Sequence, residues 1–122
     1  MANSITRHHG SQNLHGFSVH PGGIATELGR HTSPDELASF GLTQEVTEKV
    51  FKSAEQGAAT QVWAAVAKEL AGKGGQYLED VGETGPVEEG AGMLSPGFAE
   101  YAYDERKEEE LWRLSVEAVS KV

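Results

Sequence analysis

The stretch HPGGIATEL, residues 20–28, constrains the fold more than any other part of this sequence. It places a Pro-Gly-Gly turn directly after an apolar run at residues 14–19, which we expect to form a buried strand. Gly16 within that run would permit close contact with a neighbouring segment. A strand that ends on such a turn can bring its backbone close to another segment or to a ligand, so we expect one of these to pack against the turn.

The segment before this strand is predicted to be the end of a helix, over residues 1–9. His8 and His9 would lie in its last turn, where the helix dipole favours them. Gly10 is placed to leave the helix in a left-handed conformation. We therefore expect the sequence to start within an element.

A capping box predicts a short helix after the turn. Ser33 and Glu36 form this box, with Pro34 at the favoured first position, and Gly41 would end the helix. A second helical stretch follows at about residues 44–51. We expect the region between the turn and Gly41 to contain these local elements rather than a strand.

Another capping box, at Ser53 and Gln56, predicts a longer helix that reaches Leu70. This helix is either separate from the stretch at 44–51 or joined to it at a kink. Apolar residues recur at every fourth position along this helix. They form a stripe that we expect to pack tightly against a neighbour: Ala54, Ala58, Val62, Val66 and Leu70.

A short strand is predicted at residues 76–78, after a cluster of glycines and before an acidic turn at residues 79–80. Strand, helix and strand in this order imply a right-handed parallel crossover. Glycine, proline and glutamate dominate the next segment, so residues 82–103 are predicted to form a surface loop.

Residues 104–121 are predicted to form a final helix, in which Leu111, Leu114 and Ala118 share a face and Trp112 flanks it. The acidic run at residues 108–110 is expected to be a solvated face of this helix.

Charge and composition exclude several classes of function. The net charge is −9, and the acidic excess lies in the last third of the chain, so no clustered basic surface is available for nucleic acid. The sequence has no cysteine, which excludes a thiolate metal site and a thiol nucleophile. No apolar stretch approaches the length of a membrane span. We expect a soluble, cytoplasmic protein with neither a nucleic-acid nor a membrane partner.

Three segments carry a family likeness: VHPGGIATEL, SAEQGAATQVWAAVAKELAGKGGQYLEDV and DERKEEELWRLS. With them the chain resembles, over nearly its whole length, the C-terminal part of a short-chain dehydrogenase/reductase of the retinol-dehydrogenase-like group common in fungi. The resemblance implies an α/β fold, the C-terminal half of a Rossmann-type doubly wound parallel sheet. The strand before Pro-Gly would be the sixth of seven.

The same resemblance implies a cofactor site and a substrate site. Pro21, Gly22 and Thr26 match the family's PGxxxT segment, which lies against the nicotinamide end of NAD or NADP, and Ile24 would supply main-chain contacts there. Residues 27–42 would correspond to the mobile segment that covers substrate.

Two features of the family are absent from the sequence. No Gly-rich dinucleotide fingerprint opens a helix after a strand. No Tyr-x-x-x-Lys is present, and in the family that catalytic pair lies on the helix whose end corresponds to residues 1–9. We therefore expect residues 1–122 to form a single truncated domain without redox activity of its own. The lone chain would bind no cofactor, and NAD or NADP would bind only if an N-terminal half were present.

Acid–base chemistry is the alternative for an enzyme. His20, Glu27 and His31 flank the turn and titrate in a range suited to proton transfer, so they are candidate catalytic residues. They could serve an isomerase, cyclase or dehydratase acting on a small hydrophobic metabolite, or they could be three solvated loop residues. The histidines lack the spacing of a zinc site, so no metal site is expected.

The expected partner is a second copy or a related chain, because a two-stranded sheet leaves an edge and an apolar face of the first strand uncovered. The family commonly pairs through the long helix and the last strand, here residues 54–70 and 76–78. Small residues would let two helices approach closely: Ala54, Gly57, Ala58 and Ala59. A further alternative is that the chain is a fragment of a complete NAD(P)-dependent oxidoreductase.

Overall fold

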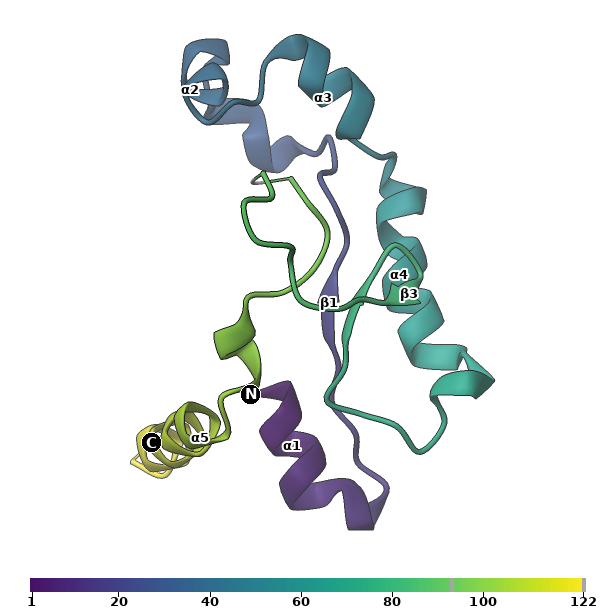
Figure 1. Ribbon diagram of the computed structural model, residues 1–122, viewed down its shortest axis with the longest axis vertical. Helices are drawn as coiled ribbons and strands as arrows, with labels where there is room; N and C mark the ends of the chain where they lie inside the picture. The colour runs from purple at the N-terminus through teal and green to yellow at the C-terminus, as the bar shows by residue number, and fades with distance from the viewer. Residues whose placement is uncertain (93, 122) are drawn as a thin grey trace.

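A small mixed sheet organises the computed structural model, which describes residues 1–92 and 94–121 (Figure 1). Its strands are β1 (Ser18–His20), β2 (Tyr77–Glu79) and β3 (Gly82–Glu83), in the order β1-β2-β3. β1 and β2 are parallel, with Val19 opposite Leu78, and β3 pairs antiparallel with β2. The predicted α/β class is therefore confirmed.

β3 lies at the start of the segment that was expected to be a surface loop. A two-residue turn at Asp80 and Val81 joins it to β2, and both residues have left-handed backbone angles (φ 51° and 58°). This geometry suits a tight hairpin. Valine rarely adopts it, which is why the sequence did not indicate a hairpin here.

β1 is shorter than the predicted strand and lies closer to the turn. Leu14, expected inside the strand, is 54% exposed. The helix before it, α1 (Ala2–His9), continues into a 3₁₀ turn, η1 (Gly10–Gln12). Gly10 keeps a right-handed conformation (φ −59°), and the left-handed residue is Asn13 (φ 61°). The predicted exit at Gly10 was wrong because the extra turn delays it by three residues.

Both predicted capping boxes are present. Ser33 caps α2 (Pro34–Ser39) and Ser53 caps α4 (Ala54–Val66), each with its partner at the third helical position. Between them lies α3 (Gln44–Val50), which is separated from α4 by extended backbone at Phe51 (ψ 136°). Another 3₁₀ turn, η2 (Glu27–His31), precedes α2. α4 ends before Leu70, which belongs to the 3₁₀ turn Lys68–Leu70.

The apolar stripe predicted on α4 is mostly solvent-exposed. Ala54 and Ala58 are exposed, and Val62 and Val66 are 58% and 73% exposed. A spacing of four drifts by about 40° per step around a helix, so the stripe winds away from the sheet. α4 turns Gly57 and Thr60 inward instead, and both are buried. Thr60 accepts a hydrogen bond from the backbone N–H of Val81 (3.2 Å), which ties α4 to the β2–β3 turn.

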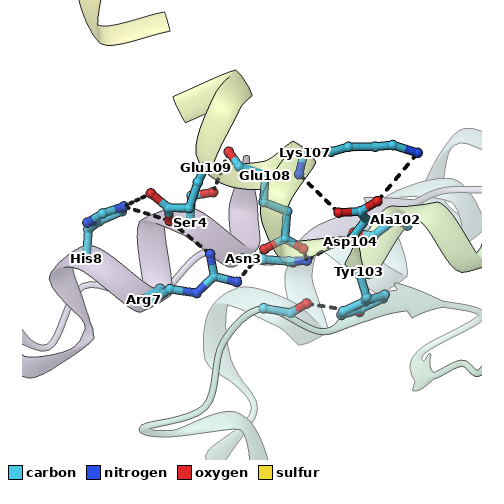
Figure 2. Close-up of polar contacts among 11 residues, drawn as sticks. Asn3, Ser4, Arg7, His8, Ala102, Tyr103, Asp104, Lys107, Glu108 and Glu109 are labelled. Carbon is cyan, nitrogen blue, oxygen red and sulfur yellow. Dashed lines mark hydrogen bonds and ion pairs between the residues drawn. The ribbon is translucent and has the colours of Figure 1, made fainter. Parts of the chain in front are cut away.

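The last helix, α5 (Glu105–Val119), lies against α1 (Figure 1) and follows the 3₁₀ turn η4 (Glu100–Tyr103). Figure 2 shows that polar side chains make this contact. The Glu108 side chain is 7% exposed and accepts hydrogen bonds from Arg7 and Asn3. The expectation that residues 108–110 form a solvated face was therefore wrong for Glu108, because its partners lie on a helix a hundred residues away.

The core of the described residues is small. Leu70 and Leu78 are its buried apolar side chains, while Leu111 and Leu114 of α5 remain 48% and 47% exposed. The accessible surface is 8809 Å², whereas a compact monomer of this mass exposes about 6,400 Å². Apolar surface thus lies open on several elements. Across residues 1–92 and 94–121, we find no helix with the length and apolar character needed to cross a membrane.

Candidate functional site

The Pro-Gly-Gly turn follows β1 at the edge of the sheet where both parallel strands end. β1 ends at His20 and β2 ends at Glu79, and these two residues are opposite each other. Ligands of open α/β sheets bind beyond this carboxyl edge. A cavity of about 510 Å³ opens there, and Gly22 and Gly23 form part of its wall.

The segment between α3 and α4 holds this turn in shape. The backbone N–H of Lys52 donates to the carbonyl of Gly23 (2.8 Å), and Ile24 forms a parallel bridge with Lys52. The Ile24 side chain lies directly on Gly57 of α4, where a Cβ would overlap it. Residues far apart in the sequence therefore form one unit with the turn.

Two observations favour glycine at position 22. Its φ is +87°, a conformation that side chains disfavour. A Cβ there would also lie 2.9 Å from Nζ and 3.1 Å from Cε of Lys52, whose side chain crosses the turn. Gly22 thus has no side chain of its own, and the Lys52 side chain lies over it.

A hydrogen-bonded pair and an ion pair lie on the cavity wall. His20 Nδ1 is 3.1 Å from Glu79 Oε1, and the other oxygen of Glu79 accepts from the N–H of Gly97 (3.0 Å). Lys52 pairs with Asp80, the residue directly after β2. The first pair joins the ends of β1 and β2, and the second joins the turn after β2 to the segment before α4, so these polar groups are held in defined positions.

Tyr77 also lines the cavity. Burial raises the pKa of its phenol above the ordinary value of 10.0, and the nearby Glu79 carboxylate raises it further. The phenol therefore stays protonated at neutral pH and can donate a hydrogen bond but not act as a base.

Apolar side chains complete the cavity. They come from the loop between α2 and α3, from the end of α3 and its exit, and from the loop before η4: Leu42, Val50, Phe51 and Leu94. A cavity with an apolar wall and a few fixed polar groups suits a small, partly apolar molecule.

Of the three candidate catalytic residues, the structure puts His20 on this cavity. Glu27 and His31 lie in η2 and are not among the residues that line it. There Arg30 donates to the ring of His31 (3.0 Å) and to the carbonyl of Glu27 (3.2 Å). The three residues are therefore not brought together around one cavity.

The candidate cofactor residues lie along the turn and just after it. Pro21 and Gly22 follow β1, and Gly22 lines the cavity. Ile24 is half-buried between the bridge to Lys52 and Gly57, and Thr26 is exposed. In residues 1–92 and 94–121, no group of three or more His, Asp or Glu side chains could hold a metal ion.

Sequence reasoning missed Lys52, Glu79 and Asp80. A signal for the two acids was present, because they directly follow a predicted strand that is parallel to the one ending at His20, and parallel strands end at the same edge of a sheet. Lys52 stands just before a helix cap and carries no such signal.

The curated relatives of this chain are oxidoreductases. It is 49% identical over 120 residues to a short-chain dehydrogenase/reductase of Penicillium roqueforti, a match that covers 98% of this chain and 35% of that protein. A short-chain dehydrogenase/reductase of Penicillium rubens is 51% identical over 116 residues, 95% of this chain and 34% of the relative. An oxidoreductase of Penicillium decumbens is 37% identical over 123 residues, 98% of this chain and 36% of the relative.

These matches confirm the resemblance to short-chain dehydrogenases/reductases over nearly the whole chain. The chain spans about a third of the length of the relatives that it matches. No family model matches it. No solved structure matches it.

Proposed function

We propose that this relative of the short-chain dehydrogenases/reductases forms the nicotinamide- and substrate-facing portion of an NAD(P)-dependent oxidoreductase, and that it acts only together with a partner portion. The observation that carries the proposal is the Gly22–Gly23 backbone on the wall of a cavity at the carboxyl edge of the sheet. The hydride chemistry would need groups that this sequence lacks, a dinucleotide fingerprint and a Tyr-x-x-x-Lys pair.

The residues present fit the nicotinamide end of such a cofactor. Gly22 and Gly23 add no side chains of their own to the wall, so a flat ring could reach the backbone of the turn beside the side chains of Lys52 and Phe51. When bound, the nicotinamide supplies hydride transfer. The chain's own residues would orient the ring through backbone groups of the turn, and the apolar side chains of Val50 and Phe51 would exclude water.

His20 would hold a proton near the same place. Glu79 next to Nδ1 favours the tautomer that carries the hydrogen on Nδ1, which leaves Nε2 as the accepting nitrogen. This arrangement lets the His20–Glu79 pair take up or return a proton at the cavity wall.

The exposed surface of the chain supports the need for a partner. It exceeds that of a compact monomer by roughly 2,400 Å², and large permanent interfaces bury areas of this order. The partner portion would be of the kind that fills the other two thirds of the Penicillium relatives.

Complementation tests the proposal. The purified chain is mixed with the part of the Penicillium roqueforti relative that it does not match, and binding of NADH and NADPH is measured by calorimetry. We expect micromolar binding by the mixture and none by either piece. Micromolar binding by the lone chain, or none by a mixture that has formed a complex, would contradict the proposal.

Glycine variants provide the matched control for this experiment. Gly22→Ala should weaken binding by the mixture, because φ is +87° and the new Cβ would displace the end of the Lys52 side chain from the turn. Gly41→Ala is the control, since Gly41 also has a positive φ (+77°) but a Cβ added there would meet no atom within 4 Å. Loss of binding in both variants would point to general destabilisation instead.

The His20–Glu79 pair favours a second candidate, a non-redox isomerase, cyclase or dehydratase acting on a small hydrophobic metabolite. Its proton chemistry would need no dinucleotide and no partner portion. In that case the lone chain would turn over its substrate, and His20→Gln would abolish the turnover. Activity that requires NAD(P)H would exclude this candidate.

A further inference from the structure

Lys52 contacts both the Pro-Gly-Gly turn and the turn after β2, and it stands at the entry to α4. Its backbone N–H donates to Gly23, its stem crosses Gly22 and its ammonium group pairs with Asp80. The side chain is 29% exposed, so water screens this pair only in part. Three separate segments thus meet at one lysine.

Asp80 is well suited to hold this lysine in place. Asp80 lies in the two-residue turn after β2. The next residue of that turn, Val81, donates its backbone N–H to the hydroxyl of Thr60 in α4. The carboxylate therefore stands on a turn that is hydrogen-bonded to α4, although the Asp80 side chain is itself 65% exposed. An ammonium group anchored there keeps the lysine stem lying across the Pro-Gly-Gly turn.

We infer that Lys52, held by Asp80, is a positioning residue that fixes the conformation of the turn at residues 21–24. Without the ion pair the lysine stem would leave the turn, and the hydrogen bond between residue 52 and Gly23 would open more often. What the turn binds rests on the proposed function, but the role of Lys52 in shaping it does not.

Hydrogen exchange in the full chain measures this role directly. The reporter is the amide of residue 52, which donates to Gly23, and the reference is the amide of Ser18, which donates to Gln76 in the sheet (3.1 Å). Lys52→Met keeps the reporter amide and the length of the stem but removes the charge. Asp80→Asn removes the negative charge of the partner and changes only an exposed side chain, so the variant should fold.

We expect both variants to speed exchange at residue 52 by about two- to fivefold, the range for a partly screened ion pair, with no change at Ser18. Lys52→Arg should restore slow exchange. Lys73→Met is the matched control, because it removes the ion pair of Lys73 with Glu83 (3.0 Å), which does not line the cavity.

Two results would overturn the inference. One is unchanged exchange at residue 52 in both Lys52→Met and Asp80→Asn. The other is an equal acceleration at residue 52 and at Ser18, which would mean that the pair adds only to global stability.

The complemented protein gives a second readout. There, Lys52→Met should raise the dissociation constant for NADPH about two- to fivefold, and Lys73→Met should leave it unchanged. If the complemented protein binds no dinucleotide at all, the proposed function fails, while the exchange result still decides the role of Lys52.

Discussion

Glu108 holds α5 on α1 through a carboxylate that is almost fully buried. Asn3 and Arg7 donate to it (Figure 2). Glu108→Ala would leave both donors without this acceptor, so we expect the free energy of unfolding in urea to fall by about 1–3 kcal/mol. Glu110→Ala, on the exposed side of the same helix, should change it by less than about 0.5 kcal/mol. An equal loss of unfolding free energy in the two variants would show that the buried carboxylate contributes no more to stability than an exposed one.

Glu109 makes the same contact sensitive to pH. Arg7, by hydrogen bonding, holds the pKa of the Glu109 carboxyl below its ordinary value of 4.5, and His8 adds to this effect. A depressed pKa in the folded chain means that the stabilisation is complete above pH 4.5 and is lost as the pH falls through the lower, folded value. We therefore expect α5 to loosen in acid.

Trp112 reports this loosening, because its ring stacks on His8 with centroids 4.8 Å apart. In a Trp63→Phe background, the fluorescence of Trp112 is followed from pH 7 downward. The change below pH 4.5 should be smaller in Glu109→Gln than in Glu110→Gln. Identical curves would argue against the contribution of Glu109.

At the scale of elements, the contact of α4 with the turn depends on the lack of a side chain at Gly57. Gly57→Ala improves helix propensity, yet we expect it to destabilise the chain by about 1–3 kcal/mol, because the new Cβ overlaps Ile24. Combining it with Ile24→Ala should recover part of the loss, which a double-mutant cycle in urea measures. Ala58→Gly, at the next and exposed position, should cost only about 0.5–1 kcal/mol. If the losses of stability from Gly57→Ala and Ile24→Ala simply add in the double variant, the proposed overlap between the new Cβ and Ile24 is contradicted.

The elements that sequence could predict are those with local causes. Ser33 and Ser53 define helix starts through bonds to residues three positions on, and both starts are as expected. The inward face of α4 and the burial of Glu108 depend on partners far along the chain, and no local pattern indicates them. The sequence makes His20 a candidate catalytic residue from its place beside the turn, and the structure puts it on the cavity. Lys52 gives no such signal, because its contacts with Gly22 and Asp80 come from other parts of the chain.

For the whole molecule, the exposed apolar surface predicts association of the chain in isolation. We propose that α4 takes part, since Val62 and Val66 are well exposed on it. Light scattering behind a sizing column should give a mass above 13.1 kDa at micromolar concentration. Val62→Glu with Val66→Glu should lower that mass, and Val116→Glu on α5 should not. A single species at the monomer mass with a cooperative melt would show that the prediction is wrong.

β1 is an end strand of the sheet within the described residues, so one row of its backbone groups has no neighbouring strand. In a cell, such an edge beside open apolar surface is what chaperones and proteases recognise. We expect copies whose exposed edge binds no partner to be degraded quickly, and copies that bind a partner there to persist. The steady-state level of this chain would then depend on the concentration of the partner that covers this edge, and not on the rate at which the chain is synthesised.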